Sequence, residues 1–199
     1  PTVCGGVTSA NLTYSATTNS PDQYSIDFNL AANTAGFMDI VNAVLTASPI
    51  VITVPGAAPA AVYSGNLTVL NSTSGCVSTV SAVTVTVVAN PTITLGASPS
   101  VCSGSTSANL PYTATTGSPN QFSINYDATA EGQGFVDVGL SALPISPISL
   151  VVPGGAAAST YNATITVRTA GGCVSSATAF TVTVVANPTI TLGASPSVC

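Results

Sequence analysis

The sequence predicts an all-β protein of tandem immunoglobulin-like antiparallel β-sandwich domains, with about seven strands each, in an extended rod. Three observations predict this fold. A nineteen-residue segment, TVTVVANPTITLGASPSVC, occurs unchanged at 84–102 and 181–199. Short runs rich in β-branched residues alternate with turns rich in Gly, Pro, Ser and Asn. No stretch shows the 3.6-residue apolar period of an amphipathic helix.

The repeat divides the chain. The two copies of the segment are 97 residues apart (181 − 84 = 97), which is a common length for one sandwich domain. We therefore expect a repeat at 1–90 that lacks its first strand, a complete repeat at 91–187, and the first strand of a following repeat at 188–199.

The second repeat shows the expected strands in order. They are the runs 92–95, 107–116, 121–127, 134–140, 147–152, 161–169 and 177–185. A β-barrel is the alternative arrangement of such strands. The penultimate strand of each repeat begins with a tyrosine, Tyr63 or Tyr161, which could cap a corner of the sandwich or simply pack in the core.

The linkers between repeats are very short. Three residues, Ala89, Asn90 and Pro91, separate the last strand of one repeat from the first strand of the next, and Ala186, Asn187 and Pro188 repeat them. Proline restricts itself and the preceding residue to extended backbone. We therefore expect adjacent domains to be held in a nearly fixed, extended relation, as in a stalk or rod.

The cysteines also follow the repeat. Cys4 and Cys102 come after the first strand of each domain, Cys76 and Cys173 lie in the hairpin before the last strand, and Cys199 begins a third repeat. We predict disulfides Cys4–Cys76 and Cys102–Cys173, and a bond from Cys199 to a residue of another repeat. Such bonds form in oxidising compartments, so the prediction places the protein outside the cell. Buried free thiols are the alternative.

The composition excludes several functions. Arg168 is the single basic residue beside six acidic residues, and the chain has no His. Nucleic-acid binding depends on clustered Lys and Arg, so we expect none. General acid–base catalysis commonly uses His or Lys, so we expect no enzyme and no cofactor. No run of 18 apolar residues exists, so we expect no insertion into a membrane.

The few carboxylates do not form a recurrent site. Asp39 and Asp137 occupy matched positions and could be calcium ligands or a repeated hydrogen-bonding feature, although no Asp-x-Asp cluster accompanies them. The position of Asp27 holds Asn125 in the other repeat, so no catalytic pair of acids recurs. We expect no metal site.

Two stretches carry a resemblance to a known family. The stretch YSGNLTVLNSTSGCVSTVSAVTVTV (63–87) resembles the end of the PKD-like and immunoglobulin-like repeats of giant Bacteroidota surface proteins, and PSVCSGSTSANLPYTATT (99–116) resembles their beginning. The resemblance implies export by the type IX system and a role in adhesins, gliding filaments or grappling fibres. It implies no catalytic residue.

The sequence thus suggests a structural segment of a long extracellular adhesin or surface filament that serves attachment, gliding motility or prey capture. The alternative is a glycan- or protein-binding module that uses loops such as 131–135 or 115–120. We expect as partners further copies of the repeat in the same chain and a host or prey surface. Because only 4% of residues are charged, we also expect a lateral homo-oligomer or bundle.

The chain ends on a copied domain junction. We expect covalent continuity into a further repeat. If the 199 residues formed a complete subunit, residues 188–195 of one chain could fill the place of the missing first strand in the next chain, by donor-strand complementation.

Overall fold

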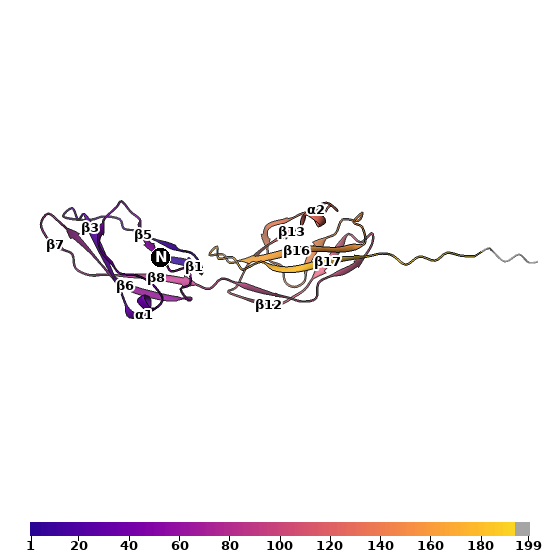
Figure 1. Ribbon diagram of the computed structural model, residues 1–199, viewed down its shortest axis with the longest axis horizontal. Helices are drawn as coiled ribbons and strands as arrows, with labels where there is room; N and C mark the ends of the chain where they lie inside the picture. Colours follow the sequence, from indigo (N-terminus) through magenta and orange to yellow (C-terminus); the bar gives the residue numbers. More distant parts are fainter. Residues whose placement is uncertain (194–199) are drawn as a thin grey trace, which may run out of the picture. The chain divides into compact units, whose positions relative to one another are not determined.

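The structure is a computed structural model that describes residues 1–193 of the chain. The chain folds into two compact units, unit 1 (Pro1–Asn90) and unit 2 (Pro91–Cys199). In each of them, long neighbouring strands form the main sheet (Figure 1). In unit 1 these are β6 (Ala61–Asn71) and β8 (Ser81–Val88), and in unit 2 they are β16 (Ser159–Arg168) and β17 (Thr178–Val185).

Unit 1 contains one large and one small sheet. The large sheet has the order β1 (Thr2–Cys4), β8 (Ser81–Val88), β6 (Ala61–Asn71), β3 (Gln23–Phe28) and β4 (Ile40–Val44), with β7 (Cys76–Val77) also paired to β6. The small sheet pairs β2 (Ser9–Leu12) with β5 (Ile50–Thr53). All pairs are antiparallel except β1 with β8, which is parallel.

Unit 2 repeats this topology and adds one pair. Its large sheet has the order β10 (Ser100–Cys102), β17 (Thr178–Val185), β16 (Ser159–Arg168), β13 (Gln121–Tyr126) and β14 (Val138–Ala142). Two antiparallel pairs accompany it, β11 (Ser107–Leu110) with β15 (Ile148–Val151), and β12 (Tyr112–Thr116) with β9 (Thr92–Leu95). The additional pair of β9 with β12 has no equivalent among the strands of unit 1.

Each core lies between a large sheet and the smaller pairs. Alternate residues of β17 are buried, as a strand with one face toward a core requires, and Phe180, Val182 and Val184 are each at most 4% exposed. They pack with Leu110 and Ile148 of the smaller pair. The two faces enclose one core, so the predicted β-sandwich fold is confirmed and the barrel alternative is wrong.

Several strand boundaries differ from the prediction. The run 107–116 is divided at Pro111, which has no N–H to donate to a ladder. The run 134–140 begins as a loop, and β14 starts only at Val138. The short strands β1 and β10 were not predicted as separate strands. Each pairs in parallel with the last strand of its unit. With only three residues, neither strand is long enough to show an alternating pattern in the sequence.

Each unit also has a short helix that the sequence analysis missed. These are α1 (Leu30–Thr34) and α2 (Ala128–Glu131). The Asn29 side chain accepts a hydrogen bond from the Ala32 N–H, and Asp127 does the same for Ala130, so both helices have a conventional N-cap. Helices of four or five residues are too short to display an apolar period, so only their capping residues indicate them in the sequence.

A tyrosine corner closes each unit. The Tyr63 hydroxyl donates to the Pro59 carbonyl at 2.7 Å, and the Tyr161 hydroxyl donates to the Ala157 carbonyl at 2.6 Å. Both rings are also buried and pack against a phenylalanine ring, with centroids less than 5 Å apart. The corner and the core-packing interpretations of these tyrosines therefore both hold.

Candidate interaction site: a strand groove and two cysteine-bearing ends

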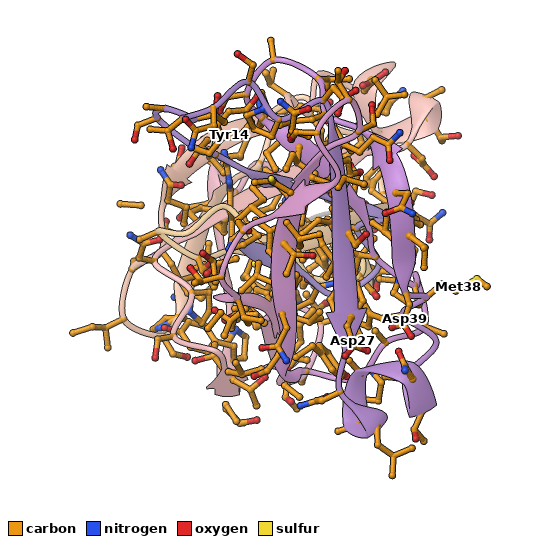
Figure 2. The ribbon with its side chains drawn as sticks, turned by 90° about the vertical axis from the view of Figure 1, so that its left-hand side faces the viewer. Tyr14, Asp27, Met38 and Asp39 are labelled. Carbon is orange, nitrogen blue, oxygen red and sulfur yellow. The ribbon has the colours of Figure 1, made fainter. Side chains whose placement is uncertain are left out.

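Unit 1 has an apolar groove where unit 2 has a strand. The groove has a volume of about 730 Å³ and its lining includes Leu12, Tyr14, Leu67, Val69 and Cys76. One wall is the segment 13–18, which forms no strand. Tyr14 lies in this segment, and Figure 2 shows it on the opposite side of unit 1 from Asp27 and Asp39.

The corresponding segment of unit 2 is an ordered strand. Tyr112 matches Tyr14 in the repeat, and the segment 112–116 forms β12 because β9 pairs with it. In β9 the Ile93 side chain is 6% exposed and belongs to the core, and Leu95 packs against that core. The strand that is absent beside 13–18 is thus the strand that completes the core of unit 2.

Burial in the two cores reflects this difference. In unit 2, Leu110, Ile165 and Val167 are 0% exposed. Their repeat equivalents in unit 1, which are Leu12, Leu67 and Val69, are only partly buried. The groove of unit 1 therefore leaves apolar surface uncovered that a strand with the sequence of β9 would cover.

A second segment of the chain has the sequence of β9. Residues 189–192 read TITL, as residues 92–95 do. They form no strand, and Ile190 and Leu192 are 83% and 81% exposed. Figure 1 shows this segment as the yellow extension that leaves unit 2. The same four-residue sequence is thus a paired, core-covering strand at 92–95 and an exposed segment at 189–192.

The two cysteines of each unit lie at opposite ends of its sandwich. Because β1 runs parallel to β8, Cys4 pairs with Val88, the last residue of β8. Cys76 lies in the hairpin before β8 and pairs with Asn71. We call these the exit end and the hairpin end. In unit 2, Cys102 lies opposite Val185 at the exit end, and Cys173 lies in the hairpin before β17.

The predicted disulfides Cys4–Cys76 and Cys102–Cys173 are therefore wrong. A strand rises about 3.3 Å per residue, so the length of β8 places the two ends of a unit roughly 25 Å apart, whereas a disulfide needs Cα atoms within about 7 Å. Accordingly, Cys76 and Cys102 are free and exposed. The prediction failed because it placed the first cysteine beside the start of the last strand, whereas parallel pairing places it beside the end.

The remaining cysteines differ from these two. Cys4 at an exit end and Cys173 at a hairpin end are both disulfide-bonded. Each is the repeat equivalent of a free cysteine, since Cys4 matches Cys102 and Cys173 matches Cys76. Cys199, for which we predicted a bond to another repeat, lies outside the described residues.

The linker asparagines are fixed to the exit end of their own unit. The Asn90 side chain donates to the Gly5 carbonyl at 3.1 Å, and Asn187 donates to the Ser103 carbonyl at 3.1 Å. The Gly5 and Ser103 N–H groups in turn donate to the last residues of β8 and β17. In each unit this clamp ties the linker to the turn that follows the exit-end cysteine, a role that the sequence analysis did not foresee.

The matched aspartates are hydrogen-bond acceptors. The Asp39 carboxylate accepts the Phe28 N–H at 2.8 Å, and Asp137 accepts the Tyr126 N–H at 2.8 Å. The ladder with the edge strand ends before each of these residues, at Ile26 and at Ile124, so the aspartate supplies the acceptor that the edge strand does not. In Figure 2, Asp39 lies near Asp27 and close to α1. The hydrogen-bonding interpretation is therefore confirmed.

Asp127 has a similar structural role at the start of α2. Its carboxylate accepts the Ala130 N–H at 2.8 Å and the Asn162 side-chain amide at 2.9 Å. These hydrogen bonds, that of Ala130 first, hold the pKa of Asp127 below its ordinary value. The repeat equivalent is Asn29, which caps α1 without a charge.

The described residues hold neither a cluster of metal ligands nor a helix that could span a membrane. Within residues 1–193, no group of three or more His, Cys, Asp or Glu side chains could hold a metal ion. Over the same residues, no helix is long and apolar enough to cross a membrane. The loop 131–135, a candidate for ligand binding, has structural contacts, since Gln133 accepts the Ala157 N–H and Phe135 is buried.

Solved structures of known proteins resemble this chain at low sequence identity. No known protein family and no curated protein matches the sequence. The chain is similar to the fibronectin(III)-like modules of CbhA from Clostridium thermocellum, with 16% identity over 93% of this chain and 89% of that chain, and a TM-score of 0.44. Chicken CNTN1 domains FN1–FN3 share 12% identity over 92% and 68% of the two chains, with a TM-score of 0.42.

The chain is also similar in structure to the D00–D0 domain of intimin. It shares 12% identity over 89% of this chain and 95% of that chain, with a TM-score of 0.36. The assignment of an immunoglobulin-like repeat rests on the sheet topology and core of each unit. It is consistent with a structural or binding module.

Proposed function

We propose that the chain is a structural repeat segment of a long extracellular adhesin or surface filament, that it has no catalytic activity, and that it serves attachment, gliding motility or prey capture. One observation carries the proposal. Two successive units share one sheet topology, and in both of them an asparagine clamps the outgoing linker onto the exit end. A protein that gains length by adding units requires such a repeated, fixed exit.

The cysteines and the surface agree with this role. Disulfide-bonded Cys4 and Cys173 indicate an oxidising location. The resemblance to Bacteroidota repeats suggests export by the type IX system. A 4% charged fraction limits repulsion between neighbouring copies. The edge strand β4 exposes Val41 and Val44, at 75% and 74%, so we propose that copies also associate laterally along this edge.

Imaging of the native assembly tests the proposal. Antibodies against the chain, used in immunogold electron microscopy of the source cells, should label threads or bundles at the surface at regular intervals along their length. Labelling of isolated particles, or of the cell interior, would contradict the proposal.

A binding module is the second candidate, and one observation favours it. Unit 2 has a hollow of about 530 Å³ whose lining includes Asn125, Asp127, Asn162 and Thr164. Amide, carboxylate and hydroxyl groups are suited to hydrogen-bonding a sugar. A glycan array probed with the intact chain tests this alternative. Binding that Asn162→Ala abolishes would support it, and the absence of any bound glycan would count against it.

A further inference from the structure

We propose that strand β4 of unit 1 pairs antiparallel with β4 of unit 1 in a second copy, across a two-fold axis, with Val41 of each copy opposite Val44 of the other. The inference names the partner and the register of the lateral contact, and it rests on the proposed structural role for its biological meaning. Its physical basis is the open edge of the large sheet in unit 1.

Strand β4 is the outermost strand on one side of that sheet. The sheet ends with β1 on one side and with β4 on the other, and among the described residues β4 pairs only with β3. The outward-facing N–H and C=O groups of an edge strand have no partner within the sheet, and a further strand can bind them. The edge is therefore a surface suited to strand pairing.

The backbone of Val44 faces out of the sheet. The next residue, Leu45, donates its N–H to the Asp22 carbonyl at 2.9 Å, on the side of β3. Successive residues of a strand direct their N–H and C=O groups to alternate sides in the plane of the sheet. The N–H and C=O groups of Val44 therefore point away from β3, toward the open edge.

A bulge directs the backbone of Val41 outward as well. Asn42 has a φ of 47°, and its N–H donates to the Ser25 hydroxyl oxygen at 2.9 Å, again on the side of β3. The register of β4 with β3 shifts at this point, as an extra residue in one strand requires. The alternation is thus reset between Asn42 and Val44, and Val41 faces the open edge.

The same two valines also present their side chains to solvent. Val41 and Val44 are mostly exposed, whereas Ile40 and Ala43 pack against the core. With Val41 opposite Val44 in antiparallel register, the two side chains share one face of the joined sheet, and their backbones exchange two N–H···O bonds. The two-fold axis forms this pair twice, so the edge is complementary to itself.

No charge at the edge opposes this pairing. Residues 40–47, IVNAVLTA, contain neither a charged residue nor a proline. In the proposed register Asp39 lies opposite Thr46, so the two Asp39 residues are seven positions apart (46 − 39 = 7), roughly 23 Å, whereas the Debye length is about 8 Å. The Asp22 carboxylate accepts the Ser72 N–H at 2.8 Å and therefore faces β6.

Unit 2 has the equivalent strand without these features. Strand β14 is likewise the outermost strand of its sheet. The positions of Val41 and Val44 hold Gly139 and Ala142 in the repeat. The Gly139 carbonyl accepts the Ser141 hydroxyl at 2.9 Å. The backbone acceptor that matches the outward-facing carbonyl of Val41 is thus occupied within unit 2 itself.

Unit 1 does not form the corresponding hydrogen bond. Ala43 occupies the position of Ser141 and has no hydroxyl, so it leaves the Val41 carbonyl to another strand. The fold does not require the valines, since β14 pairs with β13 in the register that β4 has with β3. The valines of β4 therefore contribute to a contact outside the unit.

Met38 extends the apolar part of this edge. It is 81% exposed, and Figure 2 shows it beside Asp39, pointing away from the unit. In the proposed register it would lie beside Ala47 of the second copy. A contact of this length buries less than the roughly 1,200 Å² of a standard interface, so one pair of units associates weakly, and repeated contacts along two filaments add their strength by avidity.

Exchange of the edge residues between units tests the pairing. The variant Val41→Gly, Ala43→Ser, Val44→Ala gives β4 three residues that β14 already accommodates. We expect it to lower the association constant between copies at least tenfold, because burying one valine side chain contributes about a decade of affinity or more. Light scattering of reduced protein over a concentration series measures association. Ala142→Lys, at the matched position of unit 2, is the control and should change nothing.

Single charges test the register. Val44→Lys and Val41→Glu should each associate at least tenfold more weakly than the wild-type chain, because each buries a charge in the contact. A mixture of the two should associate at least tenfold more strongly than either alone, since it restores one pair of valines and places the new lysine opposite the new glutamate. A mixture of Val44→Lys with Val44→Glu should stay weak, because the new charges are not opposite each other.

Three results would overturn the inference. The first is equal association of the wild-type chain and the exchanged-edge variant. The second is recovery in the mixture of the two Val44 variants and not in the other mixture, which would contradict the antiparallel register. The third is the absence of association in the wild-type chain up to its solubility limit. Each would leave the proposed structural role standing, since imaging of native assemblies tests that role.

Discussion

The Tyr161 hydroxyl donates a hydrogen bond to the Ala157 carbonyl four residues earlier, and Tyr63 makes the same contact with Pro59. Tyr161→Phe removes the donor and leaves the buried ring otherwise unchanged. We expect it to lower the free energy of unfolding of unit 2 by about 1 kcal/mol. Urea titration followed by circular dichroism measures the change. An unchanged transition would show that the corner contributes only packing.

Unit 1 should unfold before unit 2. It has the same topology but lacks the strand that covers Leu67 and Val69, so it buries less apolar surface. We expect two thermal transitions in dilute, reduced protein. The matched variants Ile26→Val and Ile124→Val, both at buried positions, assign them. The first should lower only the earlier transition and the second only the later one, each by about 1 kcal/mol. The opposite assignment would contradict this interpretation of the groove.

The stability of unit 2 should fall in alkaline solution. Burial, followed by the charge of Asp137, raises the pKa of Tyr126 to about 12. The folded state therefore keeps a proton that the unfolded chain releases near pH 10, so the free energy of unfolding decreases as pH rises from about 10 to about 12. Tyr126→Phe should flatten this decrease, and Phe28 already occupies the equivalent position in unit 1. An unchanged pH profile in the variant would contradict the assignment to Tyr126.

The linker clamp should be detectable by hydrogen exchange. Asn90→Ala removes the hydrogen bond to the Gly5 carbonyl, and we expect faster amide exchange at Gly5 and at the linker, with a loss of at most about 1 kcal/mol in stability. Asn187→Ala should have the same effect at Ser103, which provides an internal replicate. Equal exchange in the wild-type chain and both variants would mean that the clamp does not order the linker.

The strands could be predicted from the sequence because alternation along one strand is a local property. Val182 and Val184 on alternate positions of β17 are an example, and both are buried. The repeat also predicted that the unit at 1–90 lacks its first strand. It did not identify 112–116 as the partner of that strand in unit 2, because the pairing of β9 with β12 depends on contacts that are distant in the sequence.

The position of the cysteines could not be predicted in the same way. Whether a three-residue strand pairs parallel or antiparallel depends on contacts distant in the sequence, and that choice moves Cys4 from one end of the sandwich to the other. The Asn90 clamp depends on the same choice, because Gly5 follows the same strand. Local sequence patterns therefore predict the sandwich fold. The positions of the cysteines and of the linker clamp depend instead on how distant strands pair in three dimensions.

Disulfide mapping of the native protein tests the central claim, that no disulfide joins the exit end of a unit to the hairpin end of the same unit. Arg168 is the one site for trypsin, so the non-reduced protein would be digested with pepsin, whose acidic conditions prevent thiol exchange. Mass spectrometry should find Cys4 and Cys173 in disulfide-linked peptides that contain neither Cys76 nor Cys102. Linked peptides that join Cys4 to Cys76, or Cys102 to Cys173, within single units would contradict the account.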